Sequence, residues 1–467
     1  MRTAKFFSIL FIMICTTIKN YATQIHVPSD QPTIQSGINA SSDGDTVIVD
    51  AGEYFENINL KGKNILLTSH FYESFDYKEI ENTIINGSMP ANPDSASVIL
   101  IISGEGAGCI IQGFTITGGT GTKWLDEHGA GTYREGGGIL VENATPIIRY
   151  NYIQNNSVTN YTGVLSTGGG GMRCGDSNIQ IYNNIIWNNY ATGYGGGLVF
   201  NYCNHAYVKN NLISSNTGGE DYGGGGIWAT GNEGQILEIT NNTIVNNHAT
   251  GSGTYGGKGG GLFYFSVTTL LTNSIVWGNT QTILNSIYIN GGLMTCTYSA
   301  IEEGFMGTGN IEEDPLFMDT ICFLLDTLSP CVDAGDPDEA YADIASDVMP
   351  GQAAYPSRGT LINDMGAYGG PGAQIISECM VNQPSGILHT ANNHLMIYPN
   401  PATDFLILEL NDAFDFELFS LNGSGVLHVT GLGKEIIDLT NIEAGIYFYK
   451  LQNLNGETKT GKLIINE

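Results

Sequence analysis

A short unit of sequence recurs five times between residues 136 and 279, and it restricts the chain to a repetitive fold. Each copy opens with glycines, continues with short apolar segments and ends on asparagine, as in GGGILVENATPIIRYNYIQNN. The last glycines of the runs are Gly138, Gly171, Gly197, Gly226 and Gly261. The closing asparagines follow them after 18, 18, 19, 21 and 18 residues, at Asn156, Asn189, Asn216, Asn247 and Asn279. A constant unit with joins of variable length indicates a solenoid.

The apolar segments inside each unit are too short for helices. They are rich in Ile, Val and Tyr and are interrupted every few positions by Gly or Asn, as in IQIYNNII. This pattern is typical of short strands. A coil of about 18 residues plus a loop fits a parallel β-helix, whose coils stack roughly 4.8 Å apart. One apolar column is expected in the core, at Ile153, Ile186, Ile213, Ile244 and Val276.

The glycine and asparagine columns are predicted to form corners of the coil. At the glycines we expect a backbone with positive φ, where any Cβ would also meet the neighbouring coil. Asparagine tolerates the same left-handed backbone, and stacked side-chain amides can bond from coil to coil. A second column lies six residues before each closing asparagine, at Tyr150, Asn183, Asn210, Asn241 and Asn273.

Segments on either side of the repeat carry a family resemblance. Residues 32–69 read as a short amphipathic helix followed by strands, and residues 314–372 (DPLFMD to GAYGGPG) as a closing segment. Together with the repeat they resemble the right-handed parallel β-helix family that shares the pectate-lyase architecture. The resemblance implies an all-β fold, with a right-handed single-stranded parallel β-helix over residues 23–373. It implies no single activity, because this fold hosts lyases, hydrolases, esterases and binders.

The two ends of the chain indicate export. Residues 1–22 combine Arg2 and Lys5 with the apolar run from Phe6 to Cys15, which is typical of a signal peptide. After a linker at residues 374–395, residues 396–467 alternate apolar and polar positions and predict a small β-sandwich. The motifs PNPATD and GIYFYK and the terminal KLII resemble the C-terminal sorting domain of the type IX secretion system of Bacteroidota. That resemblance implies the outer-membrane secretion machinery as a partner, followed by surface anchoring or release.

The charge of the chain limits its partners. Lys and Arg number 17 against 46 Asp and Glu, a formal net charge of −29. Nucleic acid and anionic membrane surfaces both require positive charge, so neither is an expected partner. No segment of the mature chain reads as a membrane span.

Motifs of the known β-helix enzymes are largely missing. The stretch from Gly52 to Glu56 matches the GxYxE of pectin methylesterases, but the QDTL- and DFIFG-like aspartate motifs of that family do not occur. We therefore assign GxYxE to the architecture of the first coil. Polygalacturonase and pectate-lyase patterns are missing as well. A glycosidase pair could still form from Asp126 and Glu127 with Asp176 or Asp221, the alternative being that these acids are solvated loop residues.

The variable joins between coils should project from one side, where solenoids often bind ligands. Every join offers an aromatic residue, and the longest, residues 119–135, also brings acids, including Glu135. Stacked aromatic rings with scattered polar groups suit sugars. The candidate ligand-binding residues are Trp124, His128, Tyr133, Arg134, Tyr161, Tyr194, Tyr222 and Tyr255. The alternative is that these tyrosines fold back and shield the coil.

Two weaker signals lie in the closing segment. Cys322 and Cys331 are close enough in sequence to form a disulfide in an oxidising compartment, or else they are two small buried residues. Four aspartates alternate with Gly and Pro in DAGDPDEAYAD, which suits Ca²⁺, although a solvated acidic loop is the alternative. They are Asp333, Asp336, Asp338 and Asp343.

The sequence thus predicts an exported, surface-displayed β-helix protein that binds polysaccharide or other surfaces through loops on one face. The first alternative is a polysaccharide lyase or glycoside hydrolase that acts on an extracellular glycan, and the second is a passive structural spacer. No cofactor is required by this interpretation, Ca²⁺ being the one candidate.

Overall fold

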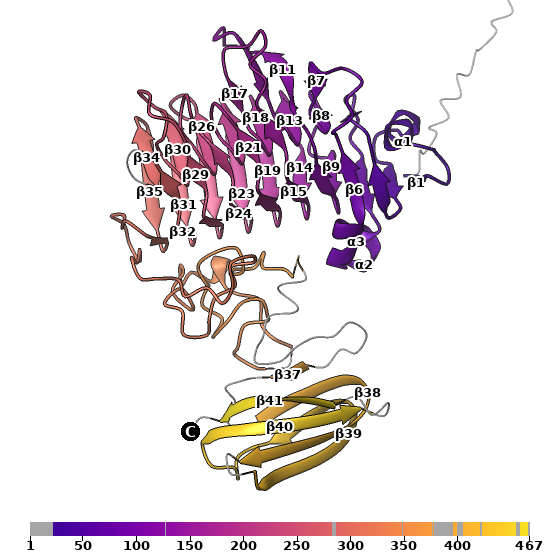
Figure 1. Ribbon diagram of the computed structural model, residues 1–467, viewed down its shortest axis with the longest axis vertical. Helices are drawn as coiled ribbons and strands as arrows, with labels where there is room; N and C mark the ends of the chain where they lie inside the picture. Colours follow the sequence, from indigo (N-terminus) through magenta and orange to yellow (C-terminus); the bar gives the residue numbers. More distant parts are fainter. Residues whose placement is uncertain are drawn as a thin grey trace, which may run out of the picture.

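The computed structural model describes residues 22–126, 128–282, 286–347, 349–375, 377, 396–398, 405–420, 423–453 and 458–465. The predicted signal peptide, apart from Ala22, most of the predicted linker, and Glu127 lie outside the described residues. From Gln24 to Ile301 the chain winds into a right-handed parallel β-helix, and Figure 1 shows the strands of successive coils side by side along the solenoid. The predicted fold class is confirmed.

Each full coil passes through four parallel sheets, which we call C, A, B and E in the order in which the chain meets them. Sheet C contains β4 (Ile58–Asn59), β8 (Ile99–Ile101), β13 (Ile139–Glu142), β18 (Met172–Gly175), β22 (Leu198–Asn201), β26 (Ile227–Thr230), β30 (Leu262–Phe265) and β34 (Ile287–Asn290). Sheet A contains β1 (Gln24–Val27), β2 (Thr46–Val49), β5 (Leu66–Ser69), β9 (Ile110–Gln112), β14 (Ile147–Arg149), β19 (Asn178–Tyr182), β23 (His205–Lys209), β27 (Ile236–Thr240), β31 (Thr268–Thr272) and β35 (Leu293–Thr297).

The two remaining solenoid sheets are built from shorter strands. Sheet B contains β3 (Gly52–Tyr54), β6 (Thr83–Asn86), β10 (Thr115–Thr117), β15 (Tyr152–Gln154), β20 (Ile185–Trp187), β24 (Leu212–Ser214), β28 (Thr243–Val245), β32 (Ile275–Trp277) and β36 (Ala300–Ile301). Sheet E contains β16 (Ser157–Val158), β21 (Tyr190–Ala191), β25 (Thr217–Gly218), β29 (His248–Ala249) and β33 (Thr280–Gln281). The predicted apolar column lies in sheet B, and all five of its side chains are fully buried in the solenoid core.

The asparagine column behaves as the sequence predicts. The Nδ2 of Asn156 donates to Oδ1 of Asn189 at 3.0 Å, and the same bond links Asn189 to Asn216, Asn216 to Asn247 and Asn247 to Asn279. All five side chains are buried. Because each amide also donates to a strand carbonyl, as Asn216 does to Ile186 at 2.8 Å, the ladder satisfies buried backbone groups as well as itself.

Of the two reasons predicted for the glycine column, close approach of the next coil and positive φ, the structure supports only the first. A Cβ on Gly197 would lie 2.6 Å from the Gly226 carbonyl oxygen, so the steric part of the prediction holds. The predicted positive φ is wrong for this column, because the left-handed residue is the glycine two positions earlier, such as Gly136 and Gly195. The chain turns there, and the strand of sheet C begins directly after the last glycine. In the same way, the residue before each ladder asparagine, such as Asn155 with a φ of 55°, takes the left-handed backbone.

The N-terminal end of the solenoid is covered by α1 (Ile34–Ala40), which buries Ile34 and Ile38 against the core. The carboxylate of Glu56 accepts hydrogen bonds from the backbone N–H groups of Ile34 at 2.8 Å and Gln35 at 3.0 Å. Since Glu56 is the acid of the GxYxE stretch, that motif holds the cap of the first coil, as expected. Two further helices, α2 (Phe71–Ser74) and α3 (Tyr77–Asn82), pack beside Tyr152 of sheet B.

The closing segment, residues 302–375, runs back along the solenoid, and the one helix or strand among its described residues is the short 3₁₀ helix η1 (Glu339–Tyr341). The second polar column holds it. Asn183 donates to the Gly372 carbonyl at 2.8 Å, Asn210 to Gly369 at 2.8 Å and Asn241 to Asp364 at 3.0 Å, while Asn273 accepts from the backbone N–H of Asp336 at 2.7 Å. Later residues of the segment therefore bind earlier coils.

Two predictions for the closing segment are wrong. Cys322 is disulfide-bonded but Cys331 is free, because the two side chains lie in different hydrophobic clusters. The four aspartates are not gathered into a calcium site. Asp333 accepts from Thr360, Asp336 from the N–H of Asp338, Asp338 from the N–H of Ala340, and Asp343 from the N–H of Gly370. Within the described ranges, no three His, Cys, Asp or Glu side chains lie together in a way that could hold a metal ion.

The C-terminal part is an antiparallel sheet with its own core. It contains β37 (Met396–Tyr398), β38 (Phe405–Ser420), β39 (Gly425–Asp438), β40 (Gly445–Asn453) and β41 (Thr458–Ile465). Phe416, Leu418, Tyr449 and Leu463 are buried in a cluster separate from that of the solenoid. The structure therefore has two independent cores, one for the β-helix and one for the tail.

Candidate ligand-binding cleft

A β-hairpin inserted before the third strand of sheet C forms one end of a cleft. It consists of β11 (Gly121–Leu125) and β12 (Thr132–Glu135), which pair with each other antiparallel and with β7 (Ser95–Ala96) and β17 (Thr167–Gly168) on their outer edges. Its tip is held by Asp126, whose Oδ1 accepts from the backbone N–H of His128 at 2.9 Å. The Oδ2 of Asp126 accepts from Nδ2 of Asn201 at 3.0 Å, which ties the tip to β22.

The floor of the cleft is the outer face of sheet C. Side chains alternate along each strand, so in β26 Ile227 and Ala229 point into the core while Trp228 and Thr230 point outward. The strands are in register, and Thr230 lies between Asn201 of β22 and Phe265 of β30. The outward residues of three neighbouring strands, roughly 10 Å apart from first to last, thus share one surface.

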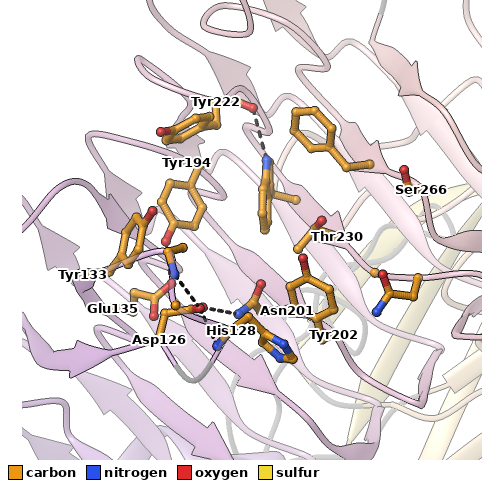
Figure 2. A pocket seen from close by; sticks show the side chains of 16 residues that line it. Asp126, His128, Tyr133, Glu135, Tyr194, Asn201, Tyr202, Tyr222, Thr230 and Ser266 are labelled. Atoms are coloured by element: carbon orange, nitrogen blue, oxygen red, sulfur yellow. Dashed lines mark hydrogen bonds between the residues drawn. The ribbon is translucent and has the colours of Figure 1, made fainter.

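The cleft has a volume of about 570 Å³, which lies in the ordinary range of ligand-binding pockets, ~300–1,000 Å³. Figure 2 shows Tyr133, Tyr194 and Tyr222 on one side and Asp126, His128, Asn201 and Tyr202 near the hairpin tip. The lining residues are Asp126, His128, Gly129, Ala130, Tyr133, Glu135, Tyr194, Asn201, Tyr202, Tyr222, Trp228, Thr230, Gly231, Asn232, Phe265 and Ser266.

Aromatic rings form the larger wall. Tyr194 meets Tyr133 and Tyr222 edge to face, with ring centroids 6.2 and 5.8 Å apart, and it lies 4.9 Å from the ring of Trp228. The indole N–H of Trp228 donates to the Tyr222 carbonyl at 3.1 Å. Tyr194 is only 5% exposed and Trp228 only 9%, whereas Tyr133 and Tyr222 are half-buried. The buried pair therefore supports two rings that remain accessible.

The hairpin end of the cleft is polar. The imidazole of His128 stacks on the ring of Tyr202, with centroids 3.9 Å apart, and its Nε2 lies 3.1 Å from Oδ2 of Asp176. Asp176 follows β18 directly and has a left-handed backbone with φ of 46°, which turns its carboxylate toward the hairpin. Histidine between two aspartates, with Asn201 beside it, offers several donors and acceptors at the edge of an aromatic wall.

A buried ionic cluster lies beneath the wall. Arg173 is fully buried, with its Nε 3.2 Å from Oε2 of Glu135 and its guanidinium also paired with Glu142. The hydroxyl of Tyr194 donates to the other oxygen of Glu135 at 2.5 Å. Burial, and next the charge of Glu135, raise the pKa of Tyr194 well above its usual range, so this phenol stays protonated. Burial likewise raises the pKa of Tyr133 to about 12, and both tyrosines remain hydrogen-bond donors at neutral pH.

Five of the predicted site residues line the cleft: Asp126, His128, Tyr133, Tyr194 and Tyr222. Asp176 contacts His128 at its edge. Tyr194 was expected to stack on a ligand, but its burial makes it a support for neighbouring rings, so for this residue the shielding alternative is the better description.

The other predicted residues lie elsewhere. Arg134 is buried, and its guanidinium bonds Asp94 at 2.6 Å and the carbonyls of Pro93 and Gly121, which excludes ligand contact through its charge. Asp221 accepts hydrogen bonds from Tyr161 and Ser166, away from the cleft. Trp124 pairs with Tyr133 across the hairpin without lining the cleft, and Tyr255 packs against Phe263 and Phe265. Glu127 is outside the described residues.

Sequence reasoning missed the part of the site that lies on strands. Asn201, Trp228, Thr230 and Phe265 occupy the second or fourth position after a glycine run, and Tyr202 follows directly. Their signal is the alternation within GGG-apolar-x-apolar-x, which places those positions outside. The prediction from the variable joins does not include this signal, because it assigns the strands to the core alone.

The fold and the cleft define the class: a parallel β-helix protein with an aromatic cleft on the outer face of one sheet. The C-terminal tail shows how the protein is exported. Residues 396–466 match the family model of the secretion system C-terminal sorting domain, so the protein is secreted through the type IX route. Among the described residues, none of the helices is both long and apolar enough to cross a bilayer.

Similar proteins cover the chain unevenly. Beta-agarase D of Zobellia galactanivorans is 32% identical over 73 residues, which are 16% of this chain and only 15% of that enzyme. A crystal structure of a pectin methylesterase variant in complex with a hexasaccharide covers 63% of this chain and 90% of its own, with 13% identity and a TM-score of 0.28.

Proposed function

We propose that this protein, which its tail directs out of the cell, binds an extracellular polysaccharide in the cleft on sheet C. The observation that carries the proposal is the combination of accessible rings, Tyr133 and Tyr222, with the polar groups of Asp126, His128 and Asn201 in one cleft. Sugar rings present apolar faces and hydroxyl edges, so they need these two kinds of group side by side.

The test is retention of purified protein on a panel of insoluble or immobilised polysaccharides. Tyr222→Ala removes an accessible ring, and a lost stacking contact of about 1 kcal/mol should weaken binding two- to tenfold. Tyr207→Ala is the matched control, because Tyr207 is a half-buried tyrosine on β23 of sheet A, facing away from the cleft. Equal losses in both variants, or a lowered melting temperature in place of lowered affinity, would contradict the proposal.

A second candidate, cleavage of a glycan, is favoured by the contact between His128 and Asp176 at the cleft edge. A histidine paired with a carboxylate can transfer protons at neutral pH. The same panel distinguishes the candidates if the soluble fraction is assayed for new reducing or unsaturated ends. If the wild type produces such new ends and Asp176→Asn does not, the protein is a hydrolase or lyase and the binding proposal is replaced. If the protein neither binds nor cleaves any polysaccharide, the remaining hypothesis is a passive structural spacer.

A further inference from the structure

Apart from the imidazole of His128, which lies 3.1 Å from the carboxylate of Asp176, the polar groups that face the cleft are uncharged or acidic. Hydroxyls and amides come from Tyr202, Thr230, Asn232 and Ser266, and of these Asn232 and Ser266 are exposed. The carboxylates come from Asp126 and Glu135. Among the described lining residues there is neither lysine nor arginine.

The nearby cations are already engaged by other groups. Arg173 lies beneath the floor, fully buried between Glu135 and Glu142, so two negative charges face one positive charge. Arg134 is directed away from the cleft to Asp94. Lys258, from the join before β30, bonds the hydroxyl of Tyr288 at 3.2 Å and lies over that ring, and Tyr288 is not part of the lining.

A negatively charged glycan would therefore meet two carboxylates in the cleft and no lysine or arginine among the described lining residues to pair with its own charge. In a partly desolvated cleft such repulsion is larger than in bulk water. The formal net charge of −29 adds a long-range barrier to the approach of any polyanion at low salt. A neutral chain meets neither barrier, and its hydroxyls can bond both carboxylates and amides.

We infer that the cleft selects uncharged glycans and rejects polyuronates and sulfated chains. This inference rests on the proposed function, because it names the ligand class of the same cleft. Selectivity arises here from repulsion of the wrong ligand together with stacking on the right one.

The experiment compares pairs of related chains, one neutral and one charged. Polygalacturonate is paired with its fully methyl-esterified form, and polymannuronate with mannan, at low and at high salt. Agarose, a neutral galactan, is compared with carrageenan, a sulfated galactan. We expect retention on at least one neutral chain and none on its charged counterpart, with neutral retention that hardly changes with salt.

A charge variant tests the cause. Asn232→Lys adds one cation to the exposed rim of the cleft and should bring retention on the charged chains to a detectable level at low salt, an effect that high salt removes. Asn178→Lys makes the same change at an exposed position of β19 on sheet A and should leave retention unchanged.

The outcomes separate the two claims. No retention on any chain overturns the proposed function. Retention on a charged chain that Tyr222→Ala abolishes keeps the function and overturns this inference. Equal effects of the two lysine variants would also overturn it, because the charge would then act from anywhere on the surface.

Discussion

At the scale of single residues, glycine and asparagine determine the shape of the coil, each for a different structural reason. Glycine is needed two positions before the end of each run for its left-handed backbone and at the end of each run for its lack of a side chain, as Gly195 and Gly197 show. Asparagine is needed because its amide can both donate and accept within a stack of identical side chains. Repetition in the sequence follows from these duties, since each coil presents the same surroundings to the next.

The steric duty predicts a specific loss of stability. In Gly197→Ala the added methyl group would lie 2.6 Å from the Gly226 oxygen, and separation of the two coils should lower the free energy of unfolding by about 1–3 kcal/mol. Gly253→Ala is the control, because the nearest atom to its Cβ would be 4.0 Å away. Thermal or urea unfolding of the two variants measures the difference, and a Gly197→Ala protein as stable as the control would refute the close approach of coils.

At the scale of elements, the periodic parts of the chain were predictable and the aperiodic parts were not. The register of sheet B follows from spacing alone, which is why Ile153, Ile186 and their successors were assigned to the core. The path of the closing segment could not be read in this way. That path depends on individual hydrogen bonds between residues more than a hundred positions apart, such as the bond from Asn210 to Gly369. For the same reason the cleft was found only in part: Tyr133 and Tyr222 signalled it, but its strand residues did not.

The closing segment also contains a pair of buried acids. Burial raises the pKa of Asp343 to about 7, and burial together with the charge of Asp343 raises the pKa of Asp364 to about 8. In the unfolded chain both would titrate near 4. The folded segment therefore binds more protons than the unfolded chain between about pH 4 and pH 8, and its stability should fall as the pH rises through that range.

Asp343→Asn should remove much of this dependence. Oδ1 of Asp343 accepts from the N–H groups of Asp364 and Gly370, while Oδ2 is buried without a hydrogen-bond partner among the described residues, so an amide fits with its NH₂ at Oδ2. The melting temperature of the variant should exceed that of the wild type by several degrees at pH 8.5 and by less at pH 5. Asp347→Asn changes an exposed acid of the same segment and serves as control. Parallel pH curves for all three proteins would show that the buried acids are not responsible.

At the scale of the whole molecule, export and the cleft belong to separate cores. The sorting tail at residues 396–466 has its own buried cluster, so its removal should not unfold the solenoid. Deletion of residues 396–467 should yield a protein with the same solenoid melting transition that is retained in the periplasm. Cell fractionation and surface labelling measure this, with full-length Tyr222→Ala as the control that must still be exported. Normal arrival of the truncated chain at the surface would contradict the role of the tail.

The course of the closing segment has a mechanical consequence. The chain leaves the solenoid not at its last coil but beside Asn183, after having passed Asn273, Asn241 and Asn210 in turn. A pull that reaches the solenoid through residues beyond 375 is therefore delivered to a middle coil. The contacts of the segment with the asparagine column, and the packing of Phe323 on Leu212 and Val245, must be broken before such a force can open the terminal coil. A solenoid would otherwise unwind most easily from its free end, and this arrangement moves the load away from that end.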